Sequence, residues 1–201
     1  MSKFRIVSFY TDDVVYREEV KNLISSIDKF NLLSYIEKID NSTSWKETGN
    51  GDAIPIVDKY WRTSVNYKPH FIKKCLDQFD ENIVWVDADA RIRQYPSLFE
   101  DIEHDVAIHF RDGKECLTGT VFFKNNQGSR DIINTWISKY NEDPCGSGNQ
   151  RTLGRVLNTR KFTMLPASYT LIFDLMKDQG PPVIEHFQAS RKKRLISGNG
   201  R

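Results

Sequence analysis

Two aspartates that follow a short apolar run are the residues best suited to chemistry. Asp87 and Asp89 are separated by Ala88 and follow Ile83 to Val86, a run of the kind that forms a strand buried on both faces. Ligands of open α/β sheets bind beyond the carboxyl ends of the strands. Two carboxylates this close repel each other and are costly to desolvate unless a cation joins them. The pair therefore predicts a divalent metal, Mg²⁺ or Mn²⁺, that holds a diphosphate.

The alternative interpretation of these aspartates is a polar strand end or a helix cap, because Asp-x-Asp is a short pattern. The surrounding elements must therefore place them. Phe4 to Tyr10 reads as a buried strand, Thr11 to Asp13 supply N-cap chemistry, and Ser34 to Ile39 reads as a second strand. Between the strands, apolar residues recur at helical spacing: Val20, Leu23, Ile24 and Ile27. A strand, helix and strand in this order predict a parallel sheet and an α/β fold.

Length and composition predict a single globular domain. The 201 residues suffice for one substantial core but not for two ordinary domains. Lys and Arg number 29 and Asp and Glu 27, a balance that argues against binding nucleic acid or an anionic membrane over the whole surface. No apolar run approaches the roughly 20 residues of a membrane span, and no signal peptide is expected. Three cysteines without metal-site spacing favour a reduced compartment, so we expect a cytoplasmic protein.

Two later segments supply further candidates. Lys68 precedes Pro69, which suits the first turn of a helix. Lys68 could reach a phosphate, and a solvated lysine is an equal alternative. Gly119 interrupts the β-rich run Leu117 to Phe123, where a glycine often marks a bulge or a close backbone approach to a ligand.

The remaining chain predicts an alternation of strands and helices. The expected strands are Asp105 to Phe110, Lys161 to Leu165 and Val183 to Phe187, and the expected helices are Ile72 to Phe79, Gly128 to Tyr140 and Gln150 to Leu157. Trp136 is expected in the core. Asn141 to Asn149, with Pro144, Gly146 and Gly148, is expected to be a flexible loop.

The order of these features resembles the GT-A class of nucleotide-sugar glycosyltransferases. The resemblance lies in Lys68 to Ile72, in the strand that ends at Asp87 and Asp89, in Thr118 to Phe123, in Gln150 at a helix start, and in a late histidine, His186. It implies a single Rossmann-like GT-A domain over residues 1–190, with a mostly parallel central sheet flanked by helices. Residues 191–201 would form a basic, flexible tail.

The resemblance implies roles for the residues of the catalytic site. Asp87 and Asp89 are expected to be metal ligands, with Asp89 the more direct one. His186 would complete the metal site, although an isolated histidine is as often structural. Lys68 would lie near the sugar or the phosphates, and Gln150 is counted with Lys68 and the aspartates among the catalytic residues.

The resemblance also implies a donor site. Tyr10, Thr11 and Asp12 would hold the nucleoside in the first loop of the sheet, although a helix cap explains Asp12 as well. Thr118 and Gly119 would line the sugar pocket. The expected donor is a UDP-sugar, with Mn²⁺ or Mg²⁺ as the cofactor. In such a transfer, the cation and positive side chains stabilise charge on the diphosphate, and a carboxylate could act as base toward an acceptor hydroxyl.

One position departs from the pattern of the class. Many relatives carry an acidic residue just before the glutamine, where this chain has Asn149. An amide cannot act as a general base. Retention of configuration is typical of relatives with this motif order, and Asn149 leaves retention and inversion both open.

Two other functions compete with sugar transfer. A haloacid-dehalogenase-type phosphatase also carries Asp-x-Asp after a strand, but near the first strand rather than in the middle of the chain. A degenerate domain that binds a nucleotide or nucleic acid without turnover is the non-enzyme alternative. The acceptor could be a glycan, a protein, a small molecule or a modified DNA base, the last because of the basic run Arg191 to Arg194. The sequence does not predict an oligomeric state.

Overall fold

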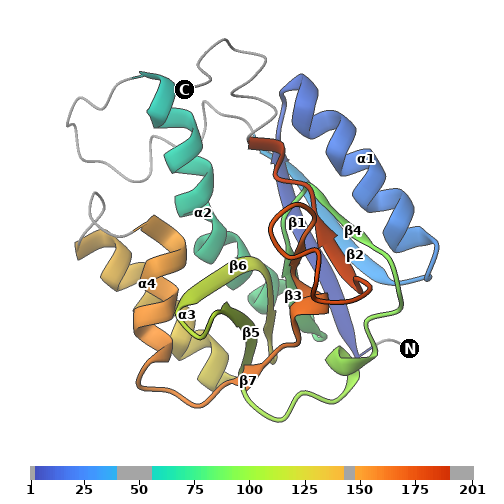
Figure 1. Ribbon diagram of the computed structural model, residues 1–201. Helices are drawn as coiled ribbons and strands as arrows, with labels where there is room; N and C mark the ends of the chain where they lie inside the picture. Colours follow the sequence, from blue (N-terminus) through green and yellow to red (C-terminus); the bar gives the residue numbers. More distant parts are fainter. Residues whose placement is uncertain (1–2, 40–55, 143–147, 191–201) are drawn as a thin grey trace.

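A six-stranded sheet forms the centre of the computed structural model, which describes residues 3–39, 56–142 and 148–190 (Figure 1). In spatial order, its strands are β2 (Leu33–Ile39), β1 (Phe4–Thr11), β3 (Asn82–Val86), β6 (Glu115–Phe123), β5 (Val106–Arg111) and β7 (Thr163–Met164). β1 runs parallel to β2 and to β3, and β5 runs parallel to β7. β6 is antiparallel to both of its neighbours. The predicted mostly parallel α/β sheet is confirmed, with β6 as its antiparallel member.

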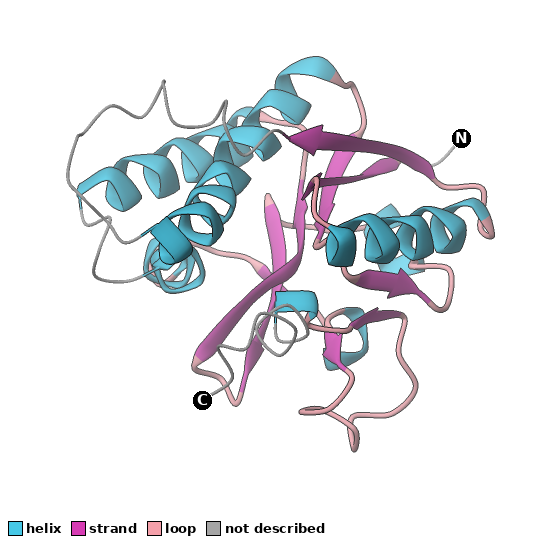
Figure 2. Ribbon diagram, turned by 90° about the horizontal axis from the view of Figure 1, so that it is seen from above, coloured by secondary structure: helices cyan, strands magenta, loops and turns pink. Residues whose placement is uncertain are grey.

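Helices cover both faces of this sheet. α1 (Val14–Asp28) lies on one side, and α2 (Ile56–Gln78), α3 (Gln127–Glu142) and α4 (Gly148–Leu157) lie on the other (Figures 1 and 2). β3 contributes to both resulting cores. Ile83 and Trp85 pack with the side chains of α2, α3 and α4, whereas Val84 and Val86 pack with those of α1. The strand before the aspartates is therefore buried on both faces, as predicted.

Helix α1 matches its predicted position but has a narrower apolar stripe. Asp13 caps the helix, because its carboxylate accepts a hydrogen bond from the backbone N–H of Tyr16 at 3.1 Å. Leu23 and Ile27 are fully buried, but Ile24 is 40% exposed. The prediction that Ile24 faces the core was wrong. At 100° per residue, Ile24 lies at the edge of the stripe that Leu23 and Ile27 centre, and it points to solvent.

Pro69 does not begin a helix, contrary to the prediction. α2 starts at Ile56, and Pro69 lies inside it. A proline within a helix removes one backbone hydrogen bond, which a long helix tolerates when packing holds it in place. Phe71 and Ile72, two and three residues after Pro69, are fully buried against the sheet. Helical spacing after Pro69 was therefore correctly recognised, but the helix start was not.

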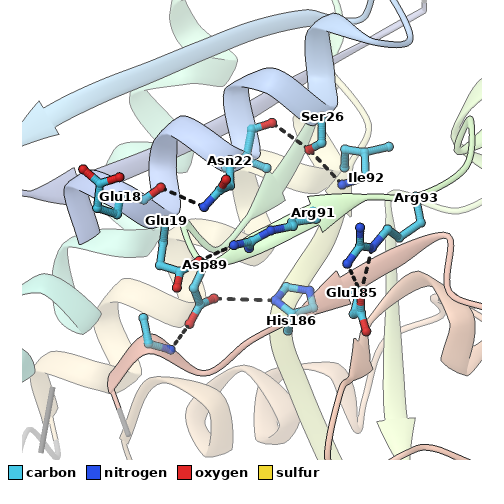
Figure 3. Close-up of polar contacts among 12 residues, drawn as sticks. Glu18, Glu19, Asn22, Ser26, Asp89, Arg91, Ile92, Arg93, Glu185 and His186 are labelled. Carbon is cyan, nitrogen blue, oxygen red and sulfur yellow. Dashed lines mark hydrogen bonds and ion pairs between the residues drawn. The ribbon is translucent and has the colours of Figure 1, made fainter. Parts of the chain in front are cut away.

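A second, three-stranded sheet adjoins α1. Its order is β4 (Ala90–Ile92), β9 (Ile184–His186) and β8 (Leu171–Ile172), with β9 antiparallel to β4 and parallel to β8. The predicted last strand is confirmed as β9, while β4 and β8 were not predicted. The described residues also contain two short 3₁₀ helices, η2 (Ser97–Glu100) and η3 (Ala167–Tyr169). The sheet is anchored to α1, because the Ser26 hydroxyl accepts a hydrogen bond from the Ile92 N–H at 2.9 Å (Figure 3).

Several predicted features fall in other places or outside the described ranges. The predicted loop 141–149 is shorter than expected, because α3 extends to Glu142 and α4 begins at Gly148. Residues 143–147 and the basic tail 191–201 lie outside the described residues. So does the polar, glycine-containing segment 41–52, which its composition also predicts to be a loop. In the part of the chain that is described, no helix is long and apolar enough to span a membrane. Trp136 is fully buried, as predicted.

Candidate functional site

The two aspartates lie on a tight turn that joins the two sheets. Asp87 follows β3 and Asp89 precedes β4, and the turn between them is closed by a hydrogen bond from the Ala90 N–H to the Asp87 carbonyl at 3.0 Å. β3 runs parallel to β1, so this turn and the loop after β1 share one edge of the sheet. The predicted position at the carboxyl end of a central strand is confirmed.

His186 comes to the aspartates from β9. The pairing of β4 with β9 sets Ala90 opposite His186, one residue from Asp89. Asp87, Asp89 and His186 each offer one ligand atom, and these atoms all lie within 4.8 Å of one another. Nδ1 of His186 is 4.0 Å from a carboxylate oxygen of Asp89 (Figure 3). The structure therefore brings together the three residues that were predicted to form the metal site.

Asp89 is held in a buried position by the backbone that follows β9. One carboxylate oxygen accepts a hydrogen bond from the Ala189 N–H at 2.7 Å, and its main-chain carbonyl accepts one from the Phe187 N–H at 3.2 Å. Burial, and then the nearby charge of Asp87, raises the pKa of the Asp89 carboxyl to about 6. The negative charge of Asp89 is thus only partly compensated by the groups around it.

Asp87 is fixed by two donors that reach the same carboxylate oxygen. The Lys68 ammonium and the Trp85 indole N–H each donate to Oδ1 at 2.8 Å. Lys68 is buried, lies over the Trp85 ring and also donates to the Thr118 carbonyl at 3.1 Å. The alternative of a solvated lysine is therefore wrong, since α2 carries Lys68 into the site.

A bulge in β6 forms the floor of the site. Ile108 of β5 pairs with Val121, but the next residue, His109, pairs with Leu117, so the segment from Thr118 to Thr120 leaves the β5 ladder. The Gly119 carbonyl instead accepts the Asp87 N–H at 2.8 Å. The predicted bulge is confirmed, and its residues contact Lys68 through Thr118, Asp87 through Gly119 and His186 through Thr120.

The imidazole of His186 rests on this bulge. Its Nε2 lies 2.8 Å from the Thr120 hydroxyl, and a Cβ at Gly119 would lie 2.9 Å from its Cε1. The close approach predicted at Gly119 is thus an approach to His186, which requires a residue without a side chain. Burial lowers the pKa of His186 to about 4. The ring is therefore neutral at neutral pH, which is the form that binds metal ions.

The donor set fits a divalent transition metal. Carboxylate oxygens suit Mg²⁺ and Mn²⁺, and an imidazole nitrogen favours a transition metal such as Mn²⁺. Burial of Asp89 beside Asp87 leaves negative charge that a cation would offset. On the chemistry of its residues, the cluster of Asp87, Asp89 and His186 is consistent with a divalent metal site.

Of the residues predicted to hold the nucleoside in the first loop, only Asp12 follows β1. Tyr10 and Thr11 are instead the last two residues of β1 and pair with β2. The Thr11 hydroxyl donates to the Asp13 carboxylate at 2.8 Å. Asp12 forms ion pairs with Lys38 at 2.7 Å and with Arg17 at 3.5 Å. The cap of α1 is Asp13, so the alternative that Asp12 serves as the cap is wrong. Tyr10 and Asp12 remain solvent-accessible at this edge of the sheet.

Gln150 and Asn149 lie in the first turn of α4. The Gln150 amide donates to the Glu115 carboxylate at 3.2 Å, at the start of β6 and three residues before Thr118. Asn149 is buried, and its main-chain carbonyl accepts a hydrogen bond from the Trp136 indole at 3.1 Å. Asn149 therefore links α4 to α3. Its side-chain amide cannot act as a base.

Three contributors to the site were not predicted from the sequence. Trp85 was expected only to pack, and Thr120 was not singled out, although alternation along a strand places each on the same face as a predicted site residue. The third contributor is the ion pair between Arg91 and the buried Glu19 at 2.7 Å, which braces β4 against α1 beside Asp89 (Figure 3). No local pattern in the sequence indicates that pair, because it joins residues of two distant elements.

Several solved structures that resemble this chain in fold are glycosyltransferases. One is a glycosyltransferase involved in glycosylation of the major capsid of PBCV-1, with 14% identity over 97% of this chain and 98% of that one, and a TM-score of 0.66. The galactosyltransferase LgtC, in complex with donor and acceptor sugar analogs, has 11% identity over 96% and 95%, and a TM-score of 0.58. Mouse xyloside xylosyltransferase 1 in its apo form has 8% identity over 93% and 98%, and a TM-score of 0.58. No protein-family model and no curated protein sequence matches the chain. The GT-A fold implied by the motif order is confirmed.

Proposed function

We propose that this GT-A-fold protein is a metal-dependent glycosyltransferase that moves a sugar from a nucleoside-diphosphate donor to an acceptor hydroxyl. The observation that carries the proposal is the convergence of Asp87, Asp89 and His186 within 4.8 Å at the edge of the sheet where ligands of such folds bind. The likeness to glycosyltransferase structures supports the class of reaction. In a phosphatase of the haloacid-dehalogenase type the Asp-x-Asp pair follows the first strand, whereas here Asp87 and Asp89 follow β3.

The metal site is proposed to consist of the two aspartates and the histidine. Asp89 and His186 are buried and hold fixed positions, whereas Asp87 is partly exposed and faces the donor side. When bound, Mn²⁺ would supply Lewis-acid stabilisation of the charge that grows on the diphosphate leaving group. Lys68 adds a second positive charge at the same place, because its ammonium already touches Asp87. The sugar-to-phosphate bond then breaks in a site that can hold the leaving group.

The donor is proposed to lie along the sheet edge between the β1 loop and the β6 bulge. Tyr10, Thr11 and Asp12 are proposed to bind the nucleoside, for which uridine is our expectation. The sugar would lie on the bulge, beside Thr118 and Gly119. For Asp12 to contact the ribose, it would exchange its ion pairs with Lys38 and Arg17 for donor hydroxyls.

The residue that orients the reacting sugar is proposed to be Gln150. Its amide can donate or accept hydrogen bonds but cannot take a proton. With Asn149 buried and also an amide, neither residue at the start of α4 serves as a general base. The proton of the acceptor hydroxyl must therefore leave to another carboxylate or to the departing diphosphate, and the stereochemical outcome stays open.

Calorimetric titration tests this proposal directly. Wild-type protein would be titrated with a panel of nucleoside diphosphates and nucleotide sugars, with and without Mn²⁺. We expect binding of one nucleotide, uridine diphosphate first among them, that requires Mn²⁺. Asp89→Ala should abolish this binding, whereas Asp131→Ala, at an exposed position on α3, should leave it unchanged.

Turnover separates an enzyme from a binding protein. Release of free nucleoside diphosphate from the sugar that binds, measured with Mn²⁺ and a panel of acceptors, is the expected result. Binding without any release would favour the degenerate domain. No binding of any nucleotide under either condition would refute the donor site itself.

A further inference from the structure

His186 is placed by the β6 bulge rather than by its own strand alone. The Thr120 hydroxyl lies 2.8 Å from Nε2, and Thr120 and His186 are both buried. The ring also lies against Gly119, where an added Cβ would be 3.1 Å from Nδ1 and 2.9 Å from Cε1. The close contact with Gly119 fixes the position of the ring. The Thr120 hydroxyl forms a hydrogen bond with only one of the two ring nitrogens, Nε2.

The two nitrogens of this ring have different surroundings. Nε2 faces Thr120, whereas Nδ1 lies 4.0 Å from a carboxylate oxygen of Asp89 (Figure 3). A half-turn of the ring about its bond to Cβ would exchange Nδ1 with a carbon and Nε2 with a carbon. Thr120 would then lose its partner, and Asp89 would face a C–H group. Only one ring orientation therefore places a nitrogen next to both Thr120 and Asp89. The hydrogen bond with Thr120 stabilises that orientation.

We infer that Thr120 is a positioning residue that orients His186 so that Nδ1, and not Nε2, is the nitrogen available to the metal. This inference rests on the proposed function, because it concerns the metal site of the transferase. Histidines that ligate metals usually donate their other ring N–H to a fixed acceptor, which sets the tautomer and the ring orientation. Thr120 occupies the place of that acceptor.

A hydroxyl has a property here that a carboxylate or a carbonyl lacks. Threonine can donate a hydrogen bond as well as accept one. Thr120 can therefore donate to Nε2 when the proton of the neutral ring is on Nδ1, and it accepts from Nε2–H when Nδ1 binds a cation. The hydrogen bond persists in both forms, so the ring keeps its orientation before the metal arrives.

Paired substitutions of Thr120 separate positioning from packing. Thr120→Val replaces the hydroxyl with a methyl group of nearly the same size, and Thr120→Ser restores the hydroxyl. Thr152→Val is a matched control, because Thr152 is also buried but bonds to the Gly148 carbonyl within α4. Thermal unfolding without metal would show whether each variant is folded.

Two measurements read the position of the ring without any sugar transfer. The first is Mn²⁺ affinity by electron paramagnetic resonance, for which we expect about a 10- to 100-fold loss in Thr120→Val, near wild-type affinity in Thr120→Ser, and no change in Thr152→Val. The second is the NMR coupling between bound cadmium and the labelled imidazole nitrogens of His186. We expect coupling to Nδ1 in the wild type and its loss in Thr120→Val.

The outcomes distinguish this inference from the proposed function. Coupling to Nε2, or unchanged Mn²⁺ affinity in folded Thr120→Val, would overturn the role of Thr120 and leave the transferase proposal intact. Thr120-dependent metal binding without turnover of any nucleotide sugar would support the inference and count against the transferase. Absence of metal binding in the wild type would overturn both.

Discussion

Asp89 should lower the stability of the metal-free protein, and Asp89→Asn should therefore raise it. Asp89 is buried, and its pKa rises from an ordinary value of 3.8 to about 6. A carboxyl whose pKa is raised by folding does not change the free energy of unfolding below pH 3.8, because it is protonated in both the folded and the unfolded state. The cost grows between pH 3.8 and about 6 and is complete above that range. An asparagine at this position carries no charge and avoids this cost.

The expected magnitude follows from the shift in pKa. A rise of roughly two pH units corresponds to about 3 kcal/mol at neutral pH, at 1.36 kcal/mol per unit. The Ala189 N–H bond to the charged carboxylate opposes this rise in pKa and is already contained in it. We therefore expect Asp89→Asn to be more stable than the wild type by about 3 kcal/mol at neutral pH, and by nothing below pH 4.

Urea denaturation in the presence of a chelator measures this difference across pH. His186 adds its own pH dependence, because its pKa falls from 6.5 to about 4 on folding, so its contribution is present above pH 6.5 and is lost as pH falls toward 4. Above pH 6.5 His186 is neutral in both the folded and the unfolded state, so the difference between the two proteins there reports on Asp89. An Asp89→Asn protein that is less stable than the wild type at neutral pH would refute the reasoning. Mn²⁺ should stabilise the wild type and leave the variant unchanged.

Three further predictions address other parts of the site and the core. Gly119→Ala should reduce Mn²⁺ affinity at least 10-fold, because its Cβ would displace His186, and an unchanged affinity by calorimetry would contradict the contact. Lys68→Met should lower the free energy of unfolding by about 1–3 kcal/mol and weaken donor binding, because the partly exposed Asp87 loses its cation. Lys68→Arg, which keeps the positive charge, is the control. Equal urea midpoints for Lys68→Met and the wild type would contradict the ion pair. Burial raises the pKa of the Cys75 thiol to about 12, so mass spectrometry should find it unlabelled by a thiol reagent at about pH 8 in the native protein, and rapid native labelling would show that α2 does not cover it.

The sheet and most of its helices could be predicted because local patterns dictate them. The run from Ile83 to Val86 is apolar throughout and becomes a strand buried on both faces. Helix α1 follows from spacing and from its cap at Asp13. The convergence of Asp87, Asp89 and His186 could be expected only from the resemblance in motif order, since nothing local to β9 brings His186 to the aspartates.

Features that depend on distant partners could not be predicted. β4 and β8 are three and two residues long, too short for a period, and they exist as strands because β9 lies between them. The start of α2 at Ile56 contradicts the usual place of a proline, because packing outweighs one lost hydrogen bond. The position of Gln150 beside Glu115 depends on how α4 packs against β6, and the spacing of residues in the sequence does not predict that packing.

The site joins distant parts of the chain, so it forms late in folding. The hydrogen bond between Asp89 and Ala189 joins residues 100 positions apart, so the chelating residues converge only after β9 has been synthesised and has docked. The second sheet that holds β9 consists of strands of two or three residues. Such a small unit opens at a lower free-energy cost than the central sheet. We expect folding of the first 160 residues to precede assembly of the site, and detachment of β9 alone to set how fast a cation enters and leaves.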